Sequence, residues 1–269
     1  MNNLQTRALS AIVLAAAVLW LTWLGGLPFR LLVILGAALV YYEWVSMAGL
    51  RISRGAVGGI ALAVVAAMLA SGAATNALAV AFLVGIGVTL AVGWGLGREM
   101  SAAAALAYAG LAAISLALLR GDDGAGLKAI LFLFAIVWAT DIAAYFTGKT
   151  FGGPKLAPKI SPGKTWSGAI GGTVAGVAAG VATAAAAGSG AVGLAAAAAF
   201  MLAVVAQAGD LFESAVKRHF GVKDSSHVIP GHGGLMDRVD GLVAAGFALY
   251  LIGVALGGVD QPSHGFFNP

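Results

Sequence analysis

The chain has 269 residues, of which 60% are hydrophobic, only 10% are charged and 40 are glycine. A soluble domain carries roughly 25% charged residues, so this chain has too few ionisable side chains to cover a water-facing surface. Disorder is excluded because it requires low hydrophobicity and dense charge, and the absence of cysteine excludes disulfides and thiolate metal sites. The sequence therefore predicts an all-α, polytopic integral membrane protein.

Nine apolar segments approach the roughly 20 residues that a helix needs to cross a hydrocarbon core of about 30 Å. They are approximately residues 8–25, 31–49, 56–71, 77–95, 101–119, 127–146, 168–188, 191–208 and 241–258. We expect about nine transmembrane helices in a single membrane domain. Within it, 1–140 would hold the N-terminal transmembrane helices and 141–269 the C-terminal catalytic membrane region.

Two polar loops, 147–167 and 209–240, interrupt this pattern. They follow the sixth and eighth helices, so two spans separate them and they emerge on the same face as the N-terminus. That face would carry twelve Lys and Arg residues, against three on the other. Basic residues concentrate in cytoplasmic loops, so both loops and the N-terminus are expected in the cytoplasm. This placement also accounts for the net charge of +4, and no nucleic-acid partner is expected.

The first loop contains Lys149, Lys155, Lys159 and Lys164 without any acid. Gly-Lys-Thr at 163–165 lacks the upstream glycine of a P-loop, where Lys159 stands. The remaining interpretation is a proline-stiffened cationic segment that attracts triphosphate or lipid phosphate. Binding of anionic lipid headgroups alone is the alternative.

A stripe of small residues runs along the seventh apolar segment with a spacing of four. It consists of Gly168, Gly172, Gly176, Gly180, Ala184 and Gly188. Such a stripe lets helix backbones approach closely. We expect internal packing that holds the two loops together, and a homodimer seam is the alternative.

The second loop contains five of the eleven acidic residues. Asp210, Glu213 and Lys217 are three and four residues apart, so they share one face of a continuing eighth helix. Asp237 and Asp240 share the start of the ninth helix, near the positive end of its dipole. Between them, Pro-Gly-His-Gly-Gly at 230–234 lets backbone amides approach a phosphate. Carboxylates beside a glycine loop and basic side chains are typical of a Mg²⁺-nucleotide site, and mutual neutralisation at the membrane rim is the alternative.

Two further acids lie in apolar helices. A carboxylate costs about 2.5–3.5 kcal/mol at the centre of a membrane helix and usually serves a function. Asp141 is therefore expected to act as a polar anchor that faces the same cavity as the acidic loop. Glu43 has aromatic neighbours near a helix end and is interpreted as interfacial. His232, between glycines, is expected to act as a general base or phosphate donor, or to make a structural hydrogen bond.

The second loop resembles the signature of the phosphatidate cytidylyltransferase family, also called CDP-diacylglycerol synthases. The matching positions are Ser214-x-x-Lys217-Arg218-x4-Lys223-Asp224 and Ile229-Pro-x-His232-Gly233-Gly234-x-x-Asp237-Arg238-x-Asp240. The segment 155–166, Lys-Leu-Ala-Pro-Lys-Ile-Ser-Pro-x-Lys-Thr-Trp, resembles that family too. Gly163 and Ser167 depart from it, because members often have Lys and Glu there.

The resemblance implies that CTP reacts with phosphatidate to give CDP-diacylglycerol and pyrophosphate. Mg²⁺ would be the cofactor, with a second cation left open, and its ligands would be Asp210, Asp237 and Asp240. The catalytic group would also contain Lys217, Arg218, His232 and Arg238. The expected substrate-binding residues are Asp141, Lys155, Lys159, Ser161, Lys164, Thr165, Ser214, Lys223, Asp224, Gly233 and Gly234.

The expected partners are CTP, phosphatidate and membrane lipids, with a homodimer left open, and the expected location is a bacterial inner membrane. A cytidylyltransferase for another lipid phosphate is the first alternative. Lipid tails are recognised by apolar surface, which cannot be distinguished in the sequence from other apolar surface. A secondary transporter would show inverted repeats, which the sequence lacks. A phosphatidyltransferase that consumes CDP-diacylglycerol would show a paired Asp pattern in one helix, which is also missing.

Overall fold

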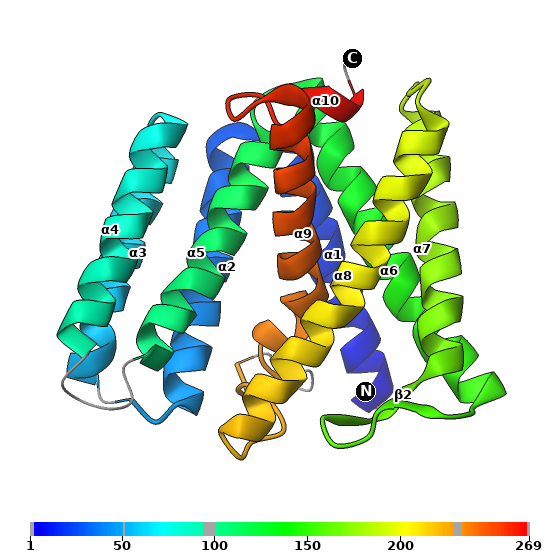
Figure 1. Cartoon of the computed structure of the whole chain (residues 1–269), viewed down its shortest axis with the longest axis horizontal. Helices are drawn as coiled ribbons and strands as arrows, with labels where there is room; N and C mark the ends of the chain where they lie inside the picture. Colours follow the sequence, from blue (N-terminus) through cyan, green and yellow to red (C-terminus); the bar gives the residue numbers. More distant parts are fainter. Residues whose placement is uncertain (1–2, 51, 94–99, 229–232, 268–269) are drawn as a thin grey trace. The chain divides into compact units, whose positions relative to one another are not determined.

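A computed structural model of the chain describes residues 3–50, 52–93, 100–228 and 233–267 (Figure 1). Helices dominate it, which confirms the all-α class. The helices are α1 (Asn3–Leu24), α2 (Gly26–Met47), α3 (Ile52–Ser71), α4 (Thr75–Gly93), α5 (Met100–Arg120), α6 (Gly124–Phe151), α7 (Trp166–Ala186), α8 (Val192–His219), α9 (Met236–Gly257) and α10 (His264–Phe267). Strands β1 (Lys155–Ala157) and β2 (Ser161–Thr165) form a hairpin before α7.

Seven helices in the described part of the chain are long and apolar enough to cross a membrane. They are α2, α4, α5, α6, α7, α8 and α9. The chain is thus a multi-pass membrane protein, as predicted. Helices α1 and α3 contribute only the shorter apolar stretches Ile12–Leu24 and Gly55–Ser71, so the expected count of nine spans is not confirmed.

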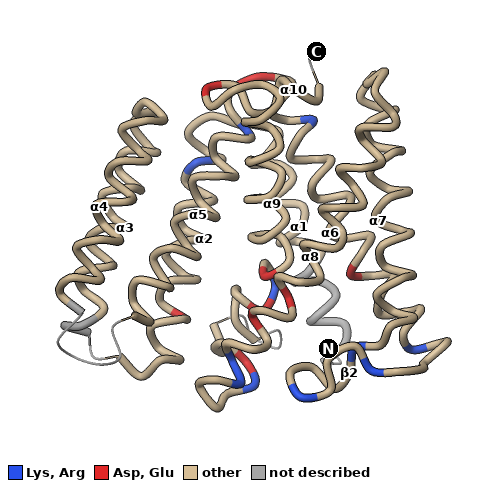
Figure 2. Tube along the Cα trace, in the orientation of Figure 1, with Lys and Arg blue, Asp and Glu red and all other residues tan. Residues whose placement is uncertain are grey.

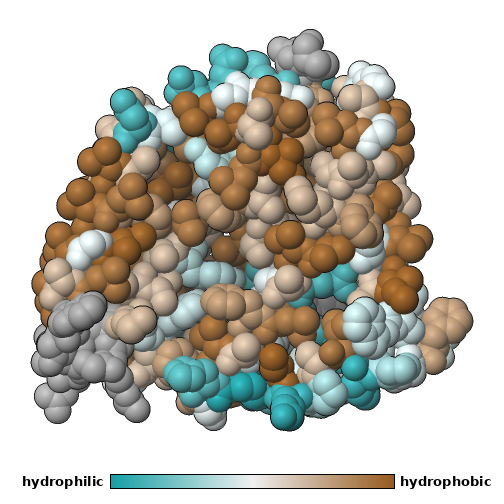
Figure 3. Space-filling view, viewed as in Figure 1, coloured by the Kyte–Doolittle hydropathy of each residue, from teal (hydrophilic) through white to brown (hydrophobic). Residues whose placement is uncertain are grey.

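The helix surfaces match this environment. Figure 2 shows long stretches of helix without Lys, Arg, Asp or Glu. Figure 3 shows predominantly hydrophobic side chains over α4, where Val80, Leu83, Val84 and Val88 are exposed. In water such a surface would be unfavourable, whereas in lipid it meets a medium of its own polarity.

The chain forms two compact units. Unit 1 comprises Met1–Ala117 and Asp224–Arg238, and unit 2 comprises Leu118–Lys223 and Val239–Pro269. The expected catalytic region, 141–269, therefore contributes to both units, and its role stays a prediction.

The predicted glycine stripe packs inside unit 2, where α7 contacts both α6 and α8. Gly168, Gly172, Gly176 and Gly180 are all buried. A β-carbon at Gly172 would lie 2.7 Å from the carbonyl oxygen of Thr140 in α6, and one at Gly180 would lie 2.6 Å from the Ala199 side chain in α8. Internal packing is thus confirmed, but Gly188 lies beyond the end of α7 and is not part of the stripe.

The hairpin connects α6 to α7 and replaces the irregular loop that the sequence suggested. Lys155 lies opposite Thr165 and Ala157 opposite Ser161 in antiparallel register. The Thr165 hydroxyl accepts a hydrogen bond from the N–H of Gly168 at 3.1 Å and so caps α7. Both polar loops are shorter than expected, because α6 continues to Phe151 and α8 to His219.

At its other end, α6 begins with a capping interaction. The Asp123 side chain accepts a hydrogen bond from the N–H of Gly126 at 2.8 Å and also pairs with the ring of His264. Burial opposes ionisation of this carboxyl, but these partners outweigh it and hold the pKa of Asp123 below its ordinary value. The pair fixes α10 against the start of α6.

We expect Gly172→Ala to destabilise the protein by about 1–3 kcal/mol, because the new methyl group would press on the Thr140 backbone, which cannot move aside. The measurement is the thermal unfolding midpoint of the purified protein in detergent, which should fall by several degrees. Gly87→Ala in α4 is the matched control, since a β-carbon there meets nothing within 4 Å. Equal midpoints for the two variants would contradict the packing role of the stripe.

Candidate functional site

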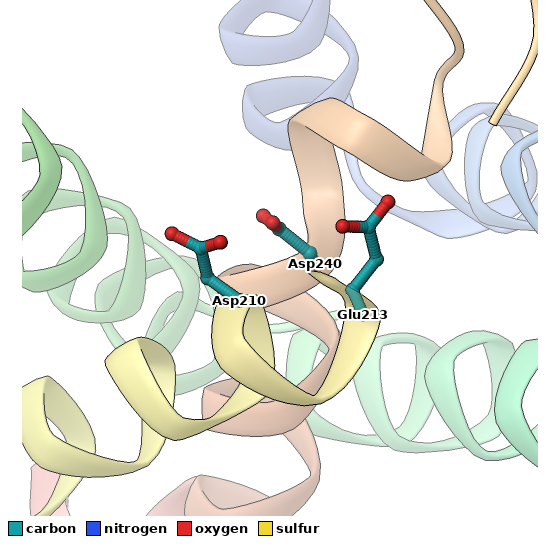
Figure 4. Close-up of side chains that lie close together, drawn as sticks. All are labelled: Asp210, Glu213 and Asp240. Carbon is teal, nitrogen blue, oxygen red and sulfur yellow. The ribbon is translucent and has the colours of Figure 1, made fainter. Parts of the chain in front are cut away.

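Three carboxylates in unit 2 form a cluster, which we call the carboxylate cluster: Asp210, Glu213 and Asp240. Each offers an oxygen such that the three oxygens lie within 4.8 Å of one another. Asp210 and Glu213 project from one face of α8, as their spacing predicted, and Asp240 projects from the first turns of α9 (Figure 4). Glu213 is fully buried, whereas Asp210 and Asp240 are partly exposed.

Small residues bring the two helices together at this point. A β-carbon at Gly209 would lie 2.9 Å from the carbonyl oxygen of Asp240, and one at Gly241 would lie 3.1 Å from that of Ala206. Each glycine directly adjoins an acid of the cluster. Close backbone contact between α8 and α9 thus places the Asp210 and Asp240 carboxylates side by side.

Two lysines face the cluster. Lys164, from the hairpin strand β2, forms an ion pair with Asp210, and Lys217 pairs with Glu213 at 2.7 Å one turn along α8. Asp141 in α6 interacts electrostatically with both Asp210 and Lys164. The expectation that Asp141 belongs with the acidic loop is therefore supported by its neighbours.

The charges of this group do not balance. Four carboxylates, including Asp141, face two ammonium groups, which leaves a formal charge of −2 when all are ionised. Carboxylates so close together repel one another unless a cation or a proton intervenes. Mg²⁺ prefers oxygen ligands and commonly takes one or two carboxylates together with substrate phosphates. The donor set and the excess negative charge of the cluster both fit a divalent cation.

The hairpin presents further predicted residues on unit 2. Lys155 and Lys159 are exposed, and Ser161 is partly exposed. Arg218 in α8 donates hydrogen bonds to the carbonyl oxygens of Ile160 at 3.4 Å and Val222 at 3.1 Å. Arg218 thus connects the hairpin turn to the end of α8 by a hydrogen bond.

Thr165 is buried, and its hydroxyl is engaged in capping α7. In unit 2, Ser214 is partly exposed on α8 and Lys223 is exposed. In unit 1, Asp224 and Arg238 are exposed. His232 lies outside the residues that the structure describes.

Asp237 belongs to unit 1, although it is only three residues from Asp240. Its carboxylate accepts hydrogen bonds from the N–H of Ser225 at 3.1 Å, the hydroxyl of Ser225 at 3.1 Å and the N–H of Gly234 at 2.9 Å. Gly233 has a φ of +82°, and a β-carbon there would lie 2.9 Å from an Asp237 oxygen. Gly234 thus brings its backbone amide up to a carboxylate, here one of the chain's own.

The surroundings of two acids were not foreseen from the sequence. Glu213 was placed on the correct face of α8 but was not named among the expected metal ligands, although the structure groups it with Asp210 and Asp240. Glu43 was interpreted only as interfacial, and its partners were not foreseen: its side chain is 0% exposed and accepts hydrogen bonds from Ser226 and Met236. The signal was the same as for Asp141: a carboxylate inside an apolar helix needs a partner.

Comparison with known proteins shows to which family the chain belongs. The chain matches the model of the cytidylyltransferase family over residues 5–256. It is 49% identical over 273 residues to the phosphatidate cytidylyltransferase of Brucella suis, covering 100% of both chains. The proteins of the same name from Haemophilus influenzae and Pseudomonas aeruginosa are 44% identical over 129 residues and 52% over 118, covering 46% and 43% of this chain and 45% and 44% of their own. The motif resemblance is thus confirmed: the chain belongs to the cytidylyltransferase family.

Proposed function

We propose that the chain transfers the cytidylyl group of CTP to phosphatidate, giving CDP-diacylglycerol and pyrophosphate in phospholipid biosynthesis. The carboxylate cluster of Asp210, Glu213 and Asp240, with lysines on two sides, is the observation that carries the proposal. Family membership supports the cytidylyl donor, and the names of the relatives support the acceptor.

The reaction exchanges one phosphoanhydride bond for another. A phosphate oxygen of phosphatidate attacks the α-phosphorus of CTP, a new P–O bond forms, and the bond from the α-phosphorus to the bridging oxygen breaks as pyrophosphate leaves. All reacting groups are anionic, so catalysis consists mainly of positioning and charge neutralisation. The residues required are cations for the phosphates and carboxylates for a metal ion.

Asp210, Glu213 and Asp240 would hold a divalent cation, for which Mg²⁺ is our proposal. When bound, it would neutralise charge on the nucleotide phosphates. Lys164 and Lys217 now pair with carboxylates of the cluster, and both can exchange these partners for phosphate oxygens. A second cation and metal ligation by Asp237 stay predictions.

The remaining positively charged residues have proposed roles in holding substrate. Lys155 and Lys159 would attract the triphosphate or the lipid phosphate from the exposed hairpin, while Arg218 and Arg238 would hold phosphates from the ends of α8 and α9. The other predicted binding residues stay predictions. They are Asp141, Ser161, Thr165, Ser214, Lys223, Asp224, His232, Gly233 and Gly234.

A cytidylyltransferase for another lipid phosphate is the alternative. The nucleotide chemistry would be the same, and only the apolar surface that receives the lipid tails would differ. Assay of the purified protein with labelled CTP and a panel of lipid phosphates distinguishes the two. A homodimer stays a prediction.

Replacing the acids that would bind the metal tests the proposed function. We expect Asp210→Asn, Asp240→Asn and Asp237→Asn each to lower CTP-dependent, Mg²⁺-dependent conversion of phosphatidate at least about 10-fold, because losing even an indirect metal partner costs about 10–100-fold. The amide keeps the size of the side chain but removes its charge. The measurement is product formation by purified protein, with folding checked by size-exclusion chromatography.

Asp260→Asn is the control for these variants, since Asp260 is exposed in the segment after α9. Electron paramagnetic resonance of bound Mn²⁺ supplies a second readout, and binding should weaken in Asp210→Asn and Asp240→Asn. Full activity in both of these variants would overturn the assignment of the metal site. Inactivity of the wild-type protein on every lipid phosphate would overturn the proposed function itself.

We further propose that the protein lies in a bacterial inner membrane with its N-terminus and both polar loops in the cytoplasm. The chain has no cysteine, so single cysteines can report orientation. Gly163→Cys in the hairpin and Gly190→Cys in the α7–α8 loop flank the two ends of one span, and each position has room for a side chain. A membrane-impermeant thiol reagent should label the first from the cytoplasmic side and the second from the opposite side. Labelling of both from one side would refute this orientation.

A further inference from the structure

Glu43 lies in α2, within the N-terminal half of the chain, yet its partners come from the segment that precedes and begins α9. Its two oxygens accept hydrogen bonds from the hydroxyls of Ser225 at 3.2 Å and Ser226 at 2.6 Å, and from the N–H groups of Leu235 at 2.8 Å and Met236 at 2.7 Å. The sequence separations are 182 to 193 residues. All five residues belong to unit 1.

Two of these bonds satisfy the start of α9. The first N–H groups of a helix have no acceptor within the helix, and a negative charge there also interacts favourably with the helix dipole. Met236 is the first residue of α9, and Leu235 precedes it. Glu43 therefore caps the N-terminus of α9, although it belongs to another helix, α2.

The hydroxyl of Ser225 connects Glu43 to Asp237. It lies 3.2 Å from an oxygen of Glu43 and 3.1 Å from an oxygen of Asp237. A serine hydroxyl has a single hydrogen, so it can donate to only one of these carboxylates at a time. Both carboxylates thus depend on the placement of one side chain.

Gly234 packs against both Glu43 and Ser225. A β-carbon at this residue would collide with the Ser225 hydroxyl and lie 2.8 Å from an oxygen of Glu43. The backbone N–H of Gly234 donates a hydrogen bond to the Asp237 carboxylate. The backbone at Gly234 can therefore lie this close to Glu43 and Ser225 only because the residue has no side chain.

A fully buried carboxylate is a poor choice for stability alone. Its removal from water costs several kcal/mol even when it is well paired, and well-packed apolar side chains often hold two elements together equally well. What a carboxylate adds is a fixed geometry for its donors. We propose that Glu43 is a positioning residue, which holds Ser225, Ser226 and the first turn of α9 so that Gly234 and Asp237 are correctly placed for the cytidylyl-transfer reaction.

This inference rests on the proposed function for its kinetic test. Glu43→Gln keeps the shape of the side chain but replaces one acceptor oxygen with an NH₂ group facing N–H donors. We expect kcat, normalised to folded protein, to fall about 10–100-fold, because misplacement by about 1 Å can cost that much. Ser226→Ala, which removes the shortest of the four bonds, should lower kcat in the same direction even where Glu43→Gln does not fold.

Tyr41→Phe is the matched control. Tyr41 lies on the same helix and donates a buried hydrogen bond to the carbonyl oxygen of Gly55 at 2.7 Å, so its loss lowers stability without touching the segment 225–237. A purely structural role of Glu43 predicts less folded protein but an unchanged kcat per folded molecule, as for Tyr41→Phe. That result in both Glu43→Gln and Ser226→Ala would overturn the proposal.

Hydrogen–deuterium exchange provides a readout that does not depend on activity. Backbone amides of residues 225–228 and 233–237 should exchange at least tenfold faster in Glu43→Gln than in the wild type, and they should be unchanged in Tyr41→Phe. Unchanged exchange in Glu43→Gln would overturn the inference. An inactive wild type with the expected exchange pattern would instead refute the proposed function and leave the contact of Glu43 with this segment intact.

Discussion

A carboxylate that enters an apolar helical protein must find its donors or its cation within the protein, because lipid offers neither. This constraint is met in two ways here. In unit 2, Asp210 and Glu213 pair with lysines, and Asp141 and Asp240 beside them give the group an excess of negative charge. In unit 1, the donors to Glu43 among the described residues are hydroxyl and backbone N–H groups. The first arrangement is held by ion pairs, whereas the second is held by hydrogen bonds to a single buried carboxylate.

Glycines at helix contacts help to meet the same constraint. Gly209 and Gly241 allow α8 and α9 to approach until their carboxylates are neighbours, and the stripe of α7 allows α6 and α8 to pack against it. An alanine at the closest contacts would separate backbones that the charged groups require to be close. Glycine in this chain therefore brings carboxylates together as well as packing helices.

Features that depend on neighbours in sequence could be predicted. The spacing of Asp210, Glu213 and Lys217 placed them on one helical face, and the four-residue period identified the stripe of α7. The family followed from side chains in the second loop. The partners of Glu43 could not be predicted, because no local pattern connects α2 with residues that are 182 or more positions away. The hairpin was also missed, since its strands are only three and five residues long and contain Pro and Gly.

The separation between Glu43 and its donors also has a consequence for biosynthesis. At about 5–20 residues per second, the segment from Ser225 to Met236 leaves the ribosome roughly 10–40 s after Glu43. During that interval α2 carries a carboxyl whose final partners do not yet exist, so water or a proton must satisfy it. Unit 1 is therefore completed only near the end of translation, by the contact between its second helix and the segment that begins α9.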